Sequence, residues 1–178
     1  MTGASAIRGY IERRDHILMR RVNRWPPPPW FRWWMICATR LGDGSLWAAL
    51  GAILIGFGGE LRFEAVEGAA FAAGVGILLF RVLKKASGRQ RPCVHESPRW
   101  FNISPPDEFS FPSGHTITAF AVSTCVGMFC PELFGVLLFF AASIALSRII
   151  LGMHFLSDVL AGSVIGAALG TAAFCLFR

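Results

Sequence analysis

Residues 133–177 read LFGVLLFFAASIALSRIILGMHFLSDVLAGSVIGAALGTAAFCLF. The charged residues of this stretch are Arg148 and Asp158 alone, and both stand between two long apolar runs. The runs, 132–151 and 155–177, each reach the length of about 20 apolar residues that a helix needs to cross a bilayer core about 30 Å thick. The stretch therefore predicts two membrane-spanning helices joined by a short polar connection.

Similar runs lie upstream. Segment 112–130 has no charged residue, and 65–83 has only Glu67 and Arg81. Segment 46–59 is also free of charge but is short. We therefore expect an all-α fold, a polytopic transmembrane helix bundle of about five spans, with six as the alternative. A soluble all-α protein is disfavoured, because a chain of this length could not bury so many apolar helices in its core.

The composition narrows the function classes. The chain has 178 residues, 54% of them hydrophobic and 16% charged, with 17 basic and 11 acidic residues and a net charge of +6. Soluble domains carry about 25% charged residues. This apolar content excludes disorder, and five cysteines, an odd number, disfavour a disulfide framework. A basic balance is typical of nucleic-acid binding, but long charge-free runs point to a bilayer and to no nucleic acid.

The first 44 residues differ from the rest, and we treat 1–44 and 45–178 as separate units. Apolar residues recur at helical spacing in 1–24 among six arginines, without the apolar centre of a signal peptide. The pattern predicts an amphipathic helix on the membrane surface, the alternative being a solvated helix packed on the bundle. Four prolines at 26–29 and the surrounding tryptophans suit the interface as well.

Polar residues collect at the ends of the predicted spans. Because successive spans cross the membrane in alternating directions, the ends near 84, 113, 148 and 155 lie at one membrane face. The residues there are Lys84, Arg91, Ser113, Gly114, His115, Arg148, His154 and Asp158. We therefore expect them to form one site.

This set has the chemistry that phosphoryl transfer requires. A transferring phosphoryl group spreads negative charge over three oxygens, which Lys84, Arg91 and Arg148 can neutralise through charge-assisted hydrogen bonds. Ser113 and Gly114 stand at a predicted helix start, where free backbone N–H groups attract anions. Because the cations neutralise the substrate, we expect no metal and no other cofactor.

The histidines and Asp158 suit the chemical step. His154 and Asp158 are four residues apart, so on a helix they would share one face. A carboxylate on one imidazole nitrogen leaves the other free to attack phosphorus, and His115 suits a general acid. Taken singly, Arg148 with Asp158 would also suit a buried ion pair, and each histidine a satisfied core residue. Their convergence favours a site.

These residues resemble the three-part signature of the type 2 phosphatidic acid phosphatase family of integral membrane lipid phosphatases. Residues 84–92 read Lys-x6-Arg-Pro, residues 112–115 read Pro-Ser-Gly-His, and residues 147–158 read Ser-Arg-x5-His-x3-Asp. The resemblance covers roughly 40–178. Members commonly have six spans, whereas this chain has the Arg-rich and Trp-Pro segment in place of the first.

The resemblance implies a metal-independent lipid phosphatase. It implies that His154 is the nucleophile and forms a phosphohistidine, that Asp158 orients it, and that His115 protonates the leaving group. The residues implied in phosphate binding are Lys84, Arg91, Ser113, Gly114 and Arg148. Family substrates include phosphatidic acid, phosphatidylglycerol phosphate, polyprenyl pyrophosphates and lipid A. Two alternatives stay open, a lipid-to-lipid phosphotransferase and a non-catalytic lipid-phosphate binding or transport protein.

We expect a multi-pass protein of the inner (cytoplasmic) membrane. Fifteen of the seventeen Lys and Arg residues fall on the face of the predicted site, whereas Arg62 and Arg178 fall on the other. The positive-inside rule places the basic face in the cytoplasm. The family resemblance favours an outward-facing site instead, so both orientations stay open. The sequence indicates neither the lipid headgroup nor the oligomeric state.

Overall fold

The computed structural model describes residues 3–95 and 107–178, and these form helices joined by short connections. The helices are α1 (Gly3–Arg24), α2 (Pro29–Leu41), α3 (Ser45–Phe57), α4 (Arg62–Ser87), α5 (Pro92–His95), α6 (Gly114–Phe129), α7 (Pro131–Ile150) and α8 (Leu156–Phe177). Within those ranges the only β pairing is an isolated bridge between Gln90 and Phe109. The predicted all-α class is confirmed.

Three helices, α4, α7 and α8, are long and apolar enough to cross a membrane. Helices α3 and α6 are apolar but shorter, with 13 and 16 residues. The five apolar helices fall where the sequence predicts spans, and the protein is a multi-pass membrane protein.

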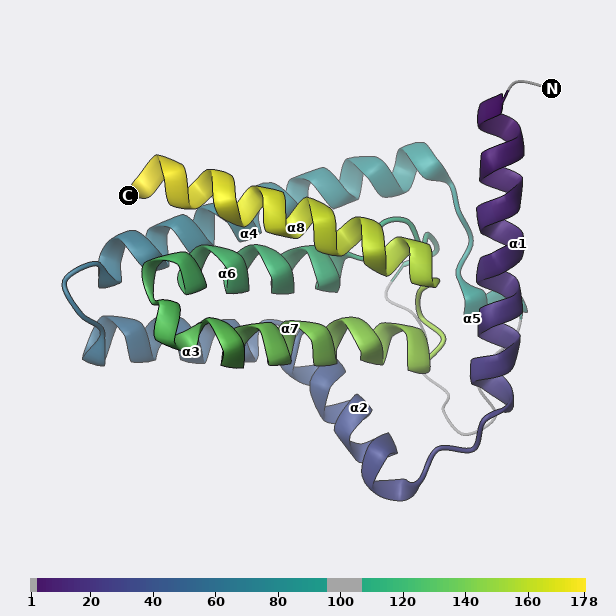
Figure 1. Cartoon of the computed structure of the whole chain (residues 1–178), viewed down its shortest axis with the longest axis horizontal. Coiled ribbons are helices and arrows are strands. Elements are labelled where there is room, and N and C mark those ends of the chain that lie inside the picture. Colours follow the sequence, from purple (N-terminus) through teal and green to yellow (C-terminus); the bar gives the residue numbers. More distant parts are fainter. Residues whose placement is uncertain (1–2, 96–106) are drawn as a thin grey trace.

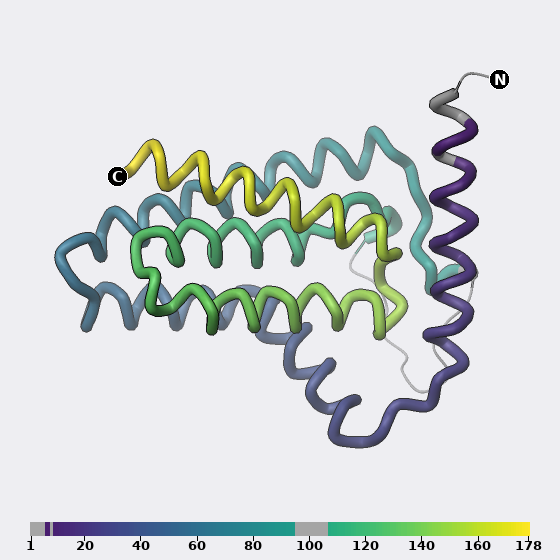
Figure 2. The backbone as a smooth tube through the Cα atoms, viewed as in Figure 1, coloured from purple at the N-terminus to yellow at the C-terminus, as the bar shows by residue number. Residues whose placement is uncertain are grey.

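The apolar helices lie alongside one another, and α1 crosses one end of the bundle at a steep angle (Figure 1). At this end α4 and α7 finish and α6 and α8 begin (Figures 1 and 2). Helix α2 leads from the end of α1 back to the bundle. The chain ends that carry the predicted site residues are therefore gathered beside α1.

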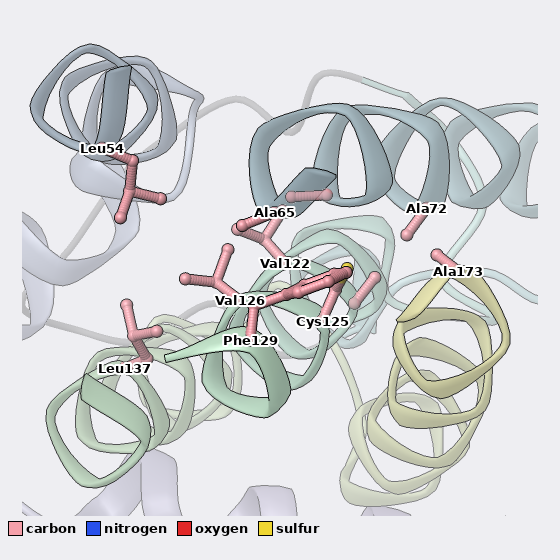
Figure 3. Close-up of a cluster of buried hydrophobic side chains, with 11 residues drawn as sticks. Leu54, Ala65, Ala72, Val122, Cys125, Val126, Phe129, Leu137 and Ala173 are labelled. Atoms are coloured by element: carbon pink, nitrogen blue, oxygen red, sulfur yellow. The ribbon is translucent and has the colours of Figure 1, made fainter. Parts of the chain in front are cut away.

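Helix α6 lies at the centre of the bundle. Figure 3 shows Val122, Cys125 and Phe129 of α6 among side chains from α3, α4, α7 and α8, including Leu54 and Ala173. Burying these apolar groups against each other packs the helices together.

The contact of α8 with α6 is especially close. Three glycines of α8, Gly162, Gly166 and Gly170, face α6, and a Cβ at Gly162 would lie 2.9 Å from the carbonyl oxygen of Ser113. Without side chains at these positions the two backbones approach directly. This contact fixes the start of α6 against the start of α8, which is where the site lies.

Candidate active site

A cavity of about 640 Å³ opens at the end of the bundle where the predicted residues gather. Its lining includes six of the eight predicted site residues: Lys84, Arg91, Gly114, His115, Arg148 and His154. The other two, Ser113 and Asp158, are fully buried behind this lining. The structure therefore brings the predicted set together, from α4, α6, α7, α8 and the connections between them.

Local backbone geometry at the end of α4 and the start of α6 shapes the lining of this cavity. Gly88 ends α4 with φ at 58°, a left-handed conformation that glycine adopts without steric penalty, and its N–H bonds to the carbonyl of Lys84. The chain then turns back so that Arg91 reaches the cavity. At the start of α6, a Cβ on Gly114 would lie 3.0 Å from the ring of Phe80 in α4. Only a residue without a side chain lets α6 begin this close to α4.

Five basic residues line the cavity, and three of them are almost completely buried. Lys84 is 7% exposed, Arg91 1% and Arg148 4%. Arg148 donates to the hydroxyl of Thr39, while its Nε has no hydrogen-bond partner among the described residues. Buried like charges repel and require a counter-anion, so this cavity is suited to an anionic group.

Asp107 supplies a negative charge to this cluster. Its carboxylate accepts from Lys84 Nζ at 2.5 Å and from Arg91 Nη2 at 2.6 Å, and its carbonyl accepts from Arg91 Nε at 2.8 Å. Burial acts to raise the pKa of Asp107, but the hydrogen bonds from the two cations outweigh it and hold the pKa below its usual value. In the sequence, only the position of Asp107 in an acidic pair with Glu108 could have pointed to this contact.

His154 is held in one tautomer. Its Nε2 lies 3.1 Å from Arg91 Nη1, and a guanidinium can only donate, so Nε2 carries the lone pair and Nδ1 the proton. Nδ1 lies 2.7 Å from the carbonyl oxygen of Ser110. Burial, followed by the nearby cations with Arg91 foremost, lowers the pKa of His154 well below its usual value. The neutral ring presents an unprotonated nitrogen at the cavity wall.

Asp158 relates to His154 differently from the prediction. The expected shared helix face is wrong, because α8 begins at Leu156 and His154 precedes it. The Asp158 carboxylate lies 3.6 Å from Nδ1, beyond hydrogen-bond distance, and the Ser110 carbonyl takes the nearer place. Asp158 instead accepts from the backbone N–H of Phe155 at 2.8 Å and from Arg89 at 2.7 Å. It therefore caps α8 while remaining beside the imidazole.

His115 has a carboxylate partner that the sequence did not reveal. Its Nε2 lies 2.7 Å from Oδ1 of Asp43, in the turn between α2 and α3. The His115 side chain is 23% exposed and that of Asp43 is 53% exposed, so the pair stands at the mouth of the cavity. The contact orients the ring of His115 in the same cavity that His154 lines.

Ser113 does not present its polar groups to the cavity in the way the sequence predicts. Its hydroxyl accepts from Thr116 at 2.9 Å, and its backbone N–H donates to the carbonyl of Asp158 at 3.2 Å. Ser113 therefore ties α6 to α8, and Gly114 and His115 form the lining at this helix start.

The site offers no obvious place for a metal ion. Within residues 3–95 and 107–178, no three His, Cys, Asp or Glu side chains are grouped as ligands for one ion. Apart from the carboxylates of Asp107 and Glu108, the charged and imidazole groups that line the cavity are nitrogen donors, which suit an anion. Metal independence stays a prediction that an assay must test.

Comparisons with known proteins agree with the signature. The model of the PAP2 superfamily matches residues 66–178. The chain is 34% identical over 123 residues to decaprenylphosphoryl-5-phosphoribose phosphatase of Mycobacterium tuberculosis, covering 69% of this chain and 65% of that protein. It is 31% identical over 161 residues to phosphatidylglycerophosphatase B of Bacillus subtilis, covering 79% of this chain and 72% of that protein. The chain thus spans just under two thirds of the length of the mycobacterial relative.

Solved structures share the fold. A transmembrane PAP2 type phosphatidylglycerolphosphate phosphatase from Bacillus subtilis superposes with a TM-score of 0.74 at 24% identity, over 94% of this chain and 86% of that one. LpxE of Aquifex aeolicus superposes with a TM-score of 0.73 at 28% identity, over 89% of this chain and 93% of that one. With the family model matching more than half of its residues, the chain belongs to the PAP2 superfamily.

Proposed function

We propose that the protein is a lipid phosphatase that hydrolyses a phosphomonoester or pyrophosphate on a membrane lipid through a phosphohistidine intermediate, without a metal. The observation that carries the proposal is one cavity in which three buried cations face a neutral, tautomer-fixed His154. The relatives named above are phosphatases of lipid or polyprenyl phosphates, which supports the same substrate class.

The first chemical step follows from this geometry. The substrate phosphate displaces Asp107 and binds Lys84, Arg91 and Arg148, which neutralise its oxygens. As Arg91 Nη1 exchanges His154 Nε2 for a phosphate oxygen, the Nε2 lone pair is freed and attacks phosphorus, and the bond from phosphorus to the leaving oxygen breaks. His115 supplies the proton that the leaving oxygen needs.

The second step regenerates the enzyme. Water attacks phosphorus, the bond from phosphorus to His154 breaks, and His115 takes the proton from the water. The carbonyl of Ser110 holds the Nδ1 proton of His154, and the carboxylate of Asp158 stabilises the positive charge that the ring carries while phosphorylated. Because the three cations screen the phosphate in both steps, the reaction needs no metal ion.

The place of the cavity favours a lipid substrate. Its lining lies at one end of the bundle of apolar helices, so a headgroup can enter it while the lipid chains stay in the bilayer. We propose the inner membrane of a bacterial cell as that bilayer. We also propose that 45–178 carry the catalytic residues, which Thr39 and Asp43 contact from outside that range. The amphipathic helix α1 would lie at the interface, where its exposed Ile7, Tyr10 and Ile17 would meet lipid.

The test is phosphate release by the purified protein in detergent, with phosphatidic acid, phosphatidylglycerol phosphate and a polyprenyl pyrophosphate, each in the presence of EDTA. We expect activity to survive chelation and His154→Ala to lower kcat by about 10³-fold or more while the thermal unfolding temperature stays near that of the parent. Rapid quenching with labelled substrate should trap an acid-labile, base-stable phosphoenzyme. Loss of activity in EDTA, or full activity of His154→Ala, would contradict the mechanism. Label that passes to an acceptor lipid rather than to water would identify a phosphotransferase.

A further inference from the structure

Helix α1 places a buried carboxylate next to the catalytic cluster. Asp15 is only 5% exposed, although α1 lies outside residues 66–178 and crosses the end of the bundle (Figure 1). Its Oδ2 accepts from Arg89 Nη2 at 2.7 Å and from the Ser157 hydroxyl at 2.5 Å, and its Oδ1 accepts from the Ser157 N–H at 3.2 Å. A buried acidic group with this many donors is fixed in place.

These contacts continue to the nucleophile. Arg89 uses Nη2 for Asp15 and Nη1 for the Ser157 hydroxyl, at 2.6 Å, and for the Asp158 carboxylate, at 2.7 Å. Asp158 is fully buried and lies 3.6 Å from Nδ1 of His154. One guanidinium thus joins the carboxylate of α1 to the carboxylate beside the proposed nucleophile.

Apolar packing seats α1 so that Asp15 reaches this position. Met19, one turn after Asp15, is 2% exposed and packs with Phe155 and Val159. The guanidinium carbon of Arg89 lies 4.2 Å from the centre of the Phe155 ring, and the His16 ring meets the same ring edge-on. Helix α1 is therefore docked on the connection between α7 and α8 that carries His154.

We infer that Asp15 is a positioning residue for catalysis, acting through Arg89 and Asp158 on His154; this rests on the proposed phosphatase function. Without Asp15, Nη2 of Arg89 would lose its carboxylate partner, and Nη1 alone would hold the guanidinium, through Ser157 and Asp158. With Asp15 present, both Nη1 and Nη2 of the Arg89 guanidinium have partners, so Arg89 and Asp158 keep one geometry. The pair of carboxylates leaves a net negative charge beside the ring of His154 when the ring becomes positive.

The test measures kcat and KM of Asp15→Asn in the full chain. The amide keeps the size of the side chain but removes its charge, and we expect kcat to fall about 10-fold with KM unchanged, because the phosphate-binding cations are untouched. Asp15→Glu should recover part of the loss. Glu12→Gln removes the same charge from the same helix one turn earlier and should keep the kcat of the parent.

A double-mutant cycle separates positioning from simple docking. If Asp15 acts through Arg89, Asp15→Asn combined with Arg89→Gln should be no slower than Arg89→Gln alone. Losses that multiply, or a matching loss in Glu12→Gln, would overturn the inference, as would an unchanged kcat in Asp15→Asn. An inactive parent chain would overturn the proposed phosphatase function and this inference with it, whereas an active parent with a fully active Asp15→Asn would overturn the inference alone.

Discussion

The Asp107 carboxylate binds Lys84 and Arg91, two of the cations that a substrate phosphate would use, so removing its charge should strengthen anion binding. The carboxylate makes charge-assisted contacts of 2.5 Å to Lys84 and 2.6 Å to Arg91. Because burial is outweighed by these contacts, the pKa of Asp107 lies below its usual value and the group stays charged at neutral pH. A phosphate must therefore displace a charged competitor before it binds.

The size of this competition follows from the contacts and their exposure. Hydrogen bonds to charged groups contribute about 1.5–3 kcal/mol when shielded. The Asp107 side chain is 40% exposed, so solvent screens part of that energy. We take roughly 1–2 kcal/mol as the net cost of displacement, which corresponds to an affinity change of about 5–30-fold.

The assay is inhibition by inorganic phosphate, the product, of the parent and of Asp107→Asn in the same detergent. We expect the inhibition constant of Asp107→Asn to be about 5–30-fold lower. Glu108→Gln is the matched control, because Glu108 is adjacent and lines the same cavity. An equal effect in Glu108→Gln would show that overall charge, not the contact, is responsible. Weaker inhibition of Asp107→Asn would refute the reasoning and indicate that Asp107 organises Arg91 for binding.

Three further predictions follow from the site and the packing. Burial and the cations lower the pKa of His154, so its imidazole ¹⁵N signals should report a neutral ring at pH 6, and a doubly protonated ring at pH 6.5 would contradict this. Because the histidine of the unfolded chain takes up a proton near pH 6.5, the free energy of unfolding should fall as the pH drops below that value. Asp43→Asn should lower kcat about 10-fold by releasing the ring of His115, and an unchanged kcat across the pH range would reject the role. Gly166→Ala should lower the thermal unfolding temperature, at a cost of about 1–3 kcal/mol, because its Cβ would collide with the backbone of α6, whereas Gly74→Ala has open space and should not lower it.

The spans could be predicted because the exclusion of charge from long runs is a direct physical requirement of the bilayer. Segments 65–83, 132–151 and 155–177 correspond to α4, α7 and α8. The two shorter helices, α3 and α6, lie within two residues of the predicted segments 46–59 and 112–130 at each end. A charge-free run fixes where a helix can lie in a membrane, whereas its ends depend on turns that hydropathy does not encode.

The residues around the cavity were predictable for a similar reason. Charged and imidazole side chains at span ends have few roles in an apolar chain, and alternation of direction brings those ends to one face. Lys84, Arg91 and Arg148 line the cavity as that argument requires. The precise partners were not predictable. The carbonyl of Ser110 accepts the hydrogen bond from Nδ1 of His154, whereas the i, i+4 spacing had favoured Asp158 as the partner.

By itself the sequence determined a basic, multi-span helical membrane protein with a cluster of cationic and imidazole side chains at one end. Those properties depend on composition and on spacing along the chain. The tertiary structure alone decided that Asp107 covers two cations, that Asp43 meets His115, and that Asp15 reaches Arg89. Each of these contacts joins residues 23 to 74 positions apart through loops or a docked helix. Directional hydrogen bonds between distant segments depend on the path of the backbone, about which hydrophobic patterning carries no information.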